Sequence, residues 1–227
     1  MRRSALCALF DLDDTMYPKG AGVMNIVSQR INEYMASRLG MDAALIKELR
    51  PRYWRQYGTT MRGLMVEYQI DPDDYLSYVH DFTVDELLAP NKALGAALAV
   101  VPWQRVIFTN ATREHAEQVL AALDVTHFFE HIFDIRDTGY IGKPDARPYQ
   151  HVLSSLGVAA QRCIALDDSL PNLRTAKDLS MLTVLVGSSD TSDGVDFVID
   201  RIEEIDRVAS ELRRRSGRVH RSGVEVL

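Results

Sequence analysis

Short apolar runs alternate along the chain with segments whose apolar residues recur at helical spacing. Four of these runs end abruptly at a carboxylate, a hydroxyl or a glycine, at residues 5–10, 105–108, 163–166 and 182–186. Strands that are apolar on both faces and alternate with helices are typical of a parallel sheet covered by helices on each side. The pattern therefore predicts an α/β fold with a Rossmann-like parallel sheet as its core.

The alternation fails between residues 17 and 90, where the apolar spacing is helical throughout. Four helices are predicted there, at residues 23–39, 43–57, 60–69 and 72–80. A connection of about 75 residues is too long for a loop in a compact sheet. We therefore predict a catalytic core of residues 1–16 plus 91–212, an inserted all-helical cap of residues 17–90, and a basic, disordered tail of residues 213–227.

Charge and composition narrow the possible functions. The 227 residues carry 26 basic and 32 acidic side chains, a net charge of −6, so a nucleic-acid partner, which needs a basic face, is not expected. The apolar runs are shorter than the roughly 20 residues that span a bilayer. The two cysteines lie inside apolar runs, as buried thiols do in a reducing compartment. We expect a cytoplasmic protein with no membrane partner, either a monomer or a homodimer.

Three carboxylates, Asp11, Asp13 and Asp14, stand within four residues at the end of the first predicted strand. Like charges that close repel each other, so the arrangement favours a bound divalent cation, and hard oxygen ligands of this kind suit Mg²⁺. Alternate residues of an extended chain point to the same side, which allows Asp11 to act as a nucleophile and Asp13 as an acid and base. The alternative is an acidic surface turn in which Asp14 or Thr15 caps a helix.

Polar residues follow the later strands in the same way. They are Thr109 and Asn110, Lys143 in the loop beyond a strand-like stretch at residues 132–135, and the pair Asp167 and Asp168. Ligands of parallel α/β sheets bind beyond the carboxyl ends of the strands, so these side chains are expected to gather at one edge. A hydroxyl and a lysine there suit a phosphate group, and a carboxylate pair can complete a metal site. Taken singly, each residue also fits a helix cap or an exposed loop.

In order along the chain, these residues resemble the four motifs of the haloacid dehalogenase superfamily, in its phosphatase branch. The matching residues are Asp11-x-Asp13-x-Thr15, then Thr109, then Lys143 before Pro144, then Asp167-Asp168. The resemblance covers nearly the whole chain except the basic tail. The helical insert also lies where that superfamily carries a cap, between the first and second motifs.

The resemblance implies a covalent mechanism in which Asp11 attacks phosphorus, and Asp13 first protonates the leaving oxygen and then activates water. It implies a Mg²⁺ ion held by Asp11, the backbone carbonyl of Asp13 and Asp168, with Asp167 as a further ligand or a neighbour of the ligands. It also implies that Thr109, Lys143 and Asn110 hold phosphate oxygens. Superfamily members that break carbon–halogen bonds lack the second carboxylate, so Asp13 argues against a dehalogenase.

Two stretches, at residues 10–22 and 57–64, resemble the pyrimidine 5′-nucleotidase group. The resemblance implies a small phosphorylated substrate, a pyrimidine nucleoside monophosphate such as UMP or CMP, with Arg62 facing it. The aromatic residues Tyr53, Trp54 and Tyr57 either stack on the base or pack inside the cap. The alternatives are a phosphatase or mutase for a small sugar phosphate or phosphoglycolate, or a catalytically silent binding protein.

Overall fold

The computed structural model describes residues 6–187 and 194–221. Its centre is a six-stranded sheet in which every strand pairing is parallel, in the order β3-β2-β1-β4-β5-β6. The strands are β1 (Cys7–Phe10), β2 (Gln104–Phe108), β3 (His131–Phe133), β4 (Cys163–Asp167), β5 (Leu182–Val186) and β6 (Phe197–Ile199). The predicted α/β fold with a parallel sheet is confirmed, although β6, a three-residue strand at one edge, was not predicted.

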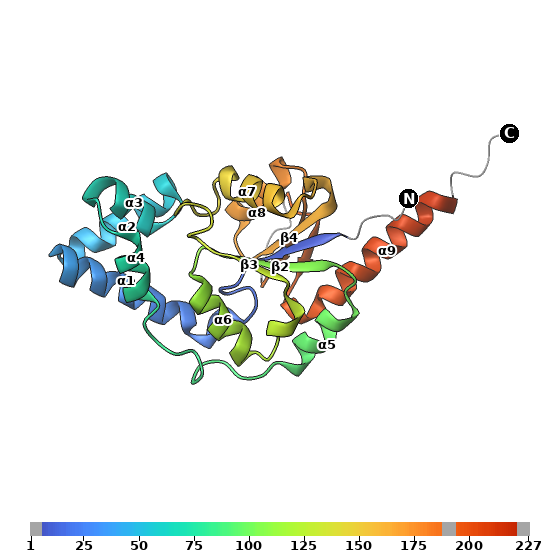
Figure 1. Cartoon of the computed structure of the whole chain (residues 1–227), viewed down its shortest axis with the longest axis horizontal. Helices are drawn as coiled ribbons and strands as arrows, with labels where there is room; N and C mark the ends of the chain where they lie inside the picture. The colour runs from blue at the N-terminus through green and yellow to red at the C-terminus, as the bar shows by residue number, and fades with distance from the viewer. Residues whose placement is uncertain (1–5, 188–193, 222–227) are drawn as a thin grey trace.

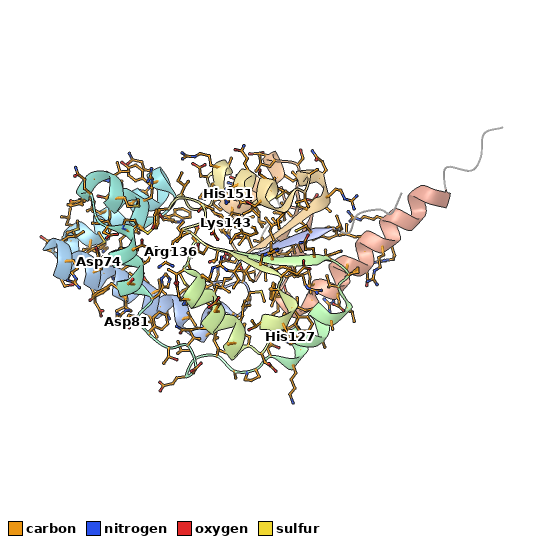
Figure 2. The ribbon with its side chains drawn as sticks, in the orientation of Figure 1. Asp74, Asp81, His127, Arg136, Lys143 and His151 are labelled. Carbon is orange, nitrogen blue, oxygen red and sulfur yellow. The ribbon has the colours of Figure 1, made fainter. Side chains whose placement is uncertain are left out.

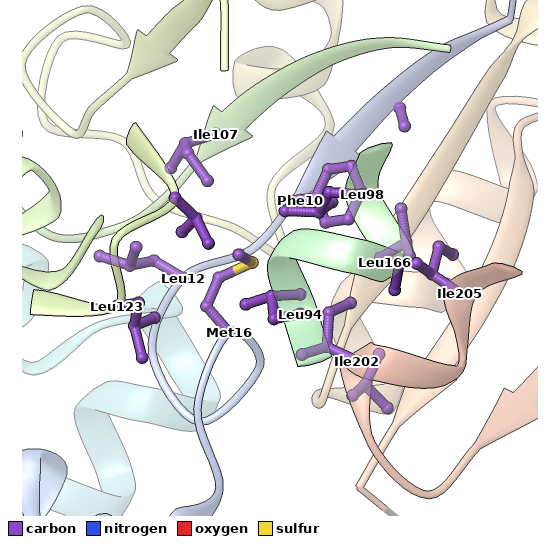
Figure 3. Close-up of a cluster of buried hydrophobic side chains, with 14 of the residues drawn as sticks. Phe10, Leu12, Met16, Leu94, Leu98, Ile107, Leu123, Leu166, Ile202 and Ile205 are labelled. Atoms are coloured by element: carbon purple, nitrogen blue, oxygen red, sulfur yellow. The ribbon is translucent and has the colours of Figure 1, made fainter. Parts of the chain in front are cut away.

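Helices cover both faces of the sheet (Figure 1). One face is covered by α5 (Lys92–Val100), α6 (Arg113–Ala122) and α9 (Ile205–Arg221), and the other by α7 (Ala146–Leu156) and α8 (Leu170–Asp178). Along β1, Phe10 packs into the first hydrophobic cluster and Leu9 into the second, because successive side chains of a strand point to opposite faces. Figure 3 shows Phe10 beside Leu98 of α5.

The cap consists of α1 (Val23–Leu39), α2 (Ala43–Tyr57), α3 (Thr60–Tyr68) and α4 (Pro72–Val79), close to the four predicted helices. Three of its helices, α2, α3 and α4, begin at side-chain caps, since Asp42, Thr59 and Asp71 each accept a hydrogen bond from a backbone N–H of the turn that follows. The cap has its own hydrophobic cluster around Tyr53 and Leu64. Short 3₁₀ helices complete the list: η1 (Lys19–Ala21), η2 (Thr126–Phe128), η3 (Ala160–Arg162) and η4 (Ile202–Glu204).

A polar contact ties the cap to the core. Arg136, in the loop after β3, donates from Nε to Asp73 Oδ1 of α4 at 2.8 Å and from Nη1 to Glu114 Oε2 of α6 at 2.8 Å. The hydroxyl of Tyr140 donates to the other oxygen of Asp73 at 2.8 Å. Figure 2 shows Arg136 at this border between cap and core. The hydrogen bonds that Asp73 accepts, first from Arg136 and then from Tyr140, lower the pKa of its carboxyl group.

The prediction of a disordered tail from residue 213 is wrong as far as residue 221, because α9 continues to Arg221. Glu211 pairs with Arg214 and Arg215, at the i+3 and i+4 spacing that stabilises a helix. The guanidinium of Arg215 also lies 4.9 Å from the ring centre of Phe197. Residues 222–227 lie outside the described part of the chain. Within the described residues, no helix is long and apolar enough to cross a membrane.

Candidate active site

The strand register brings the predicted site residues to one edge of the sheet. Phe10, the last residue of β1, is level with Ile107 of β2 and Leu166 of β4, so the polar residues that follow each strand become neighbours. The chain order places β1 between strands that come later in the sequence, where a parallel sheet opens a crevice at its carboxyl edge. The predicted gathering of these side chains is therefore what the structure shows.

Three carboxylates meet at this edge. One oxygen each from Asp11, Asp167 and Asp168 lies within 4.8 Å of the others. Burial raises the pKa of Asp11 to about 8. The positive charge of Lys143 opposes this rise, and the negative charges of Asp167 and Asp168 add to it. Hard carboxylate oxygens held this close suit a divalent cation such as Mg²⁺, which would relieve their mutual repulsion. The side chain of Asp13 turns elsewhere, and the predicted role of its backbone carbonyl in metal binding stays a prediction.

Thr15 connects Asp11, directly after β1, with Asp168, in the loop after β4. Its hydroxyl donates to Asp11 Oδ2 at 2.8 Å and accepts a hydrogen bond from the backbone N–H of Asp168 at 3.1 Å. One hydroxyl therefore fixes the orientation of Asp11 and the position of the loop after β4. The alternative that Thr15 caps a helix is excluded by these contacts.

Lys143 is buried beneath the carboxylates and is not an exposed loop residue. Its Nζ donates to Asp11 Oδ1 at 2.7 Å, to Asp167 Oδ2 at 2.9 Å and to the carbonyl of Phe108 at 2.8 Å. Burial alone would lower its pKa, but the two carboxylates raise the pKa above its ordinary value, so the ammonium stays charged. In Figure 2, Lys143 lies near the middle of the molecule, between the cap and the strands.

Thr109 and Asn110 serve the site differently from what was expected. The backbone N–H of Thr109 donates to the carbonyl of Phe133 at 3.0 Å, because it continues the β2–β3 ladder, so it is not available to a phosphate. Only the Thr109 hydroxyl is left for a ligand. Asn110 accepts from the backbone N–H of Lys143 at 2.8 Å and donates to its carbonyl at 3.0 Å. Asn110 thus holds the Lys143 loop in place, and α6 is capped by Thr112 rather than by Thr109.

Asp13 has two partners that the sequence did not reveal. Its Oδ1 accepts hydrogen bonds from the hydroxyl of Tyr17 and from Nε2 of His115, the latter at 2.9 Å. Burial alone would raise the pKa of Asp13, but the charge of His115 and these two hydrogen bonds lower it. The ring of His80 lies 4.8 Å from that of His115, and burial lowers the pKa of His80 to about 4. A histidine on the apolar face of the helix after Thr109 was the available signal for His115.

A cavity of about 280 Å³ opens above these residues, between core and cap. The core contributes Asp11, Asp13, Thr109 and Asn110, and the cap contributes a mostly apolar wall. The members of that wall are Met24, Val27, Ile31, Trp54, Met61, Leu76 and Val79, with Arg50, Thr59, Thr60, Tyr75 and His80 as its polar members.

The prediction that Arg62 faces this cavity is wrong. Arg62 lines a neighbouring hollow with Asp145 and Arg147. Thr60 borders the cavity, and a residue two positions further along a helix is rotated by roughly 200° about the axis. Arg62 therefore points to the other side of α3.

The aromatic cluster divides between the two predicted roles. Tyr53 is fully buried in the cap cluster, and its hydroxyl donates to Glu67 at 2.8 Å, so it packs and cannot stack on a ligand. Tyr57 borders the same neighbouring hollow as Arg62. Trp54 is 53% exposed and borders the cavity itself. Base stacking is therefore wrong for Tyr53 and stays a prediction for Trp54.

A parallel sheet with a carboxylate cluster at its edge and a helical cap above it is the arrangement of a capped α/β enzyme. A family model described as haloacid dehalogenase-like hydrolase matches residues 6–179, well over half of the chain. The chain belongs to this family of hydrolases.

The chain is also similar to individual proteins. Phosphate metabolism protein 8 of Saccharomyces cerevisiae is 24% identical over 187 residues, which cover 76% of this chain and 58% of the yeast protein. The chain thus spans little more than half the length of that relative. The HAD-hydrolase YfnB of Bacillus subtilis, solved bound to magnesium, superposes with a TM-score of 0.61 at 17% identity, covering 91% of this chain and 99% of that one. CbbY of Rhodobacter sphaeroides, solved with phosphate, superposes with a TM-score of 0.62 at 20% identity, covering 88% of this chain and 96% of that one.

Proposed function

We propose that this hydrolase is a Mg²⁺-dependent phosphomonoesterase that works through an aspartyl-phosphate, with pyrimidine nucleoside monophosphates as its substrates. The observation that supports it most is a single cavity that joins Asp11 and Asp13 to a mostly apolar cap wall. The magnesium and phosphate found in YfnB and CbbY agree with this chemistry.

In the first step, Asp11 attacks phosphorus, the ester P–O bond breaks, and Asp13 transfers to the leaving oxygen a proton that the second step returns to it. In the second step, the Asp13 carboxylate takes a proton from water, the water oxygen attacks phosphorus, and the bond to Asp11 breaks. Both partners of Asp13 bind Oδ1, so Oδ2 is the atom left to face the substrate.

Asp11, Asp167 and Asp168 would hold the Mg²⁺, with the backbone carbonyl of Asp13 as a further ligand. When bound, the ion would supply positive charge to the phosphoryl oxygens and to the carboxylates around them. Lys143 keeps the Asp11 carboxylate fixed at 2.7 Å and adds a second positive charge. The Thr109 hydroxyl would hold a phosphate oxygen.

The cap wall favours a nucleoside over a sugar as the leaving group. A sugar phosphate exposes hydroxyls on every side, which need polar partners when they are buried. Seven of the cap residues that line the cavity are instead apolar, including Val27, Ile31 and Trp54. Such a wall suits the flat face of a base, and a volume of about 280 Å³ favours the smaller pyrimidine ring.

Phosphate release from UMP, CMP, AMP, phosphoglycolate and several hexose phosphates tests the proposal. UMP and CMP should rank first in kcat/KM, and a higher rank for phosphoglycolate or the sugar phosphates would refute the substrate assignment. Asp11→Asn should abolish turnover on every substrate. Asp14→Asn makes the same chemical change in the same turn, on a carboxylate outside the cluster, and should keep activity. An active Asp11→Asn variant would refute the covalent mechanism.

A further inference from the structure

Two polar side chains on the cap wall of the cavity have bonding capacity that the described chain leaves unused. Arg50 of α2 makes all its hydrogen bonds through Nη1, to the carbonyl and hydroxyl of Ser28, each at 3.0 Å, and to Asn32 Oδ1 at 2.7 Å. No carboxylate of the described residues forms an ion pair with it. A half-buried guanidinium has five N–H donors, so Nε and Nη2 keep theirs for another partner.

Tyr75 of α4 is the second of these side chains. It is only 4% exposed, yet its hydroxyl makes no hydrogen bond within residues 6–187 and 194–221. Burial raises its pKa and the positive charge of Arg50 opposes that rise, which puts the hydroxyl in the electrostatic reach of the guanidinium. Tyr75 lines the cavity, so a ligand that enters the cavity can supply the partner that its hydroxyl lacks.

We propose that Arg50 and Tyr75 form a specificity subsite that binds hydrogen-bond acceptors, above all carbonyl oxygens, on the part of the substrate remote from its phosphate. This inference rests on the proposed function, since the phosphate end of the same cavity is assigned to Asp11 and its neighbours. Arg50 takes the place at the substrate that the sequence had suggested for Arg62.

The chemistry of the subsite matches a pyrimidine base. The guanidinium only donates, and both uracil and cytosine present the O2 carbonyl, so Arg50 can bind either base. The two bases differ at position 4, where uracil has a carbonyl and cytosine an amino group. A tyrosine hydroxyl can donate to the first and accept from the second, so Tyr75 can serve both. Ribose 5-phosphate carries the same phosphate ester but lacks the base, and with it the carbonyl oxygens that this subsite is proposed to bind.

The decisive experiment compares UMP and CMP with ribose 5-phosphate in Arg50→Met, which keeps much of the side-chain length and removes every donor. Its kcat/KM for UMP and CMP should fall about 10- to 100-fold, mainly through KM, the range expected for a lost hydrogen bond to a charged group. Its kcat/KM for ribose 5-phosphate should stay within about twofold of wild type. Tyr75→Phe should show the same selectivity with a loss of about 3- to 10-fold.

Two matched variants serve as controls. Arg55→Met lies on the same helix but is exposed, and Tyr34→Phe removes a hydroxyl that donates to Asp74, so both should leave all three substrates within about twofold of wild type. Equal losses on UMP and ribose 5-phosphate in Arg50→Met would overturn the inference, since they would reveal a purely structural role. If that variant fails to fold, Tyr75→Phe, which removes a single oxygen, decides the question.

Failure of the proposed function would be seen in the wild-type enzyme alone. Its kcat/KM for UMP and CMP would then be no higher than that for ribose 5-phosphate. In that event the same variants are assayed on the phosphomonoester that wild type prefers. An unchanged KM for that substrate in both Arg50→Met and Tyr75→Phe would overturn the inference.

Discussion

Replacing Lys143 by methionine removes the ammonium that lies between Asp11 and Asp167, at 2.7 and 2.9 Å. The lysine side chain is 2% exposed, so water cannot take its place. Breaking a buried ion pair by removing one partner costs about 3–5 kcal/mol. For a chain of this size, each kcal/mol lowers the melting temperature by about 2–4 °C. We therefore expect metal-free Lys143→Met to melt roughly 6–20 °C below wild type.

Thermal unfolding with EDTA and with excess Mg²⁺ tests this expectation. Mg²⁺ should raise the melting temperature of Lys143→Met more than that of wild type, because a divalent cation restores the positive charge that the variant has lost. Lys19→Met is the matched control: Lys19 contacts Asp168 at 3.0 Å, but its side chain is 62% exposed. An exposed pair contributes about 0–1 kcal/mol, so this variant should melt close to wild type.

The pH dependence gives the prediction a sign. The pKa of Asp11 is raised to about 8 from an ordinary value of 3.8, so the folded state holds the proton more tightly than the unfolded state. Its contribution to stability is therefore complete below pH 3.8 and is lost as the pH rises towards 8 in the absence of metal. Lys143→Met should steepen that loss. If Lys143→Met had the same melting temperature as Lys19→Met at pH 8 in EDTA, the reasoning would be refuted.

Three further outcomes are expected. Gly63→Ala should lower the free energy of unfolding by about 1–3 kcal/mol in urea titrations, because its new Cβ would lie 2.2 Å from Cγ of Tyr53. Asp73→Asn should flatten the fall of the melting temperature from pH 5 to pH 3, since the depressed pKa that Arg136 gives this carboxyl stabilises the folded state above 3.8 and is lost on acidification. His115→Leu should lower kcat roughly tenfold or more with KM unchanged in steady-state assays. The substitution removes the hydrogen bond that orients Asp13, the carboxylate used for proton transfer.

The sequence predicted the sheet and the carboxylates at its edge because both are written in local order along the chain. Asp11, Asp167 and Asp168 each follow an apolar run, and the carboxyl ends of parallel strands must meet. Lys143 was placed correctly for a related reason, since its loop follows β3 directly. In these cases sequence position alone fixes the side of the sheet on which a residue lies.

Residues on helices were harder to place, because what matters is the rotation of the helix about its axis. Arg50 and Arg62 both lie on cap helices, and nothing within either segment shows which of them faces the core. The packing of α2 and α3 against the rest of the molecule decides it, in favour of Arg50. His115 was missed for the same reason, although its place on the buried face of α6 is regular.

The charge of the whole chain is a poor guide to the charge of its site. The net charge of −6 argues against nucleic acid, yet the proposed ligand is itself a phosphate dianion. Without metal, the cluster of Asp11, Asp167 and Asp168 outnumbers Lys143 and would repel that dianion. A divalent cation together with the lysine ammonium balances the three carboxylates. The buried lysine and the metal thus have complementary tasks: the lysine keeps the carboxylates assembled, and the metal makes the assembled site attractive to phosphate.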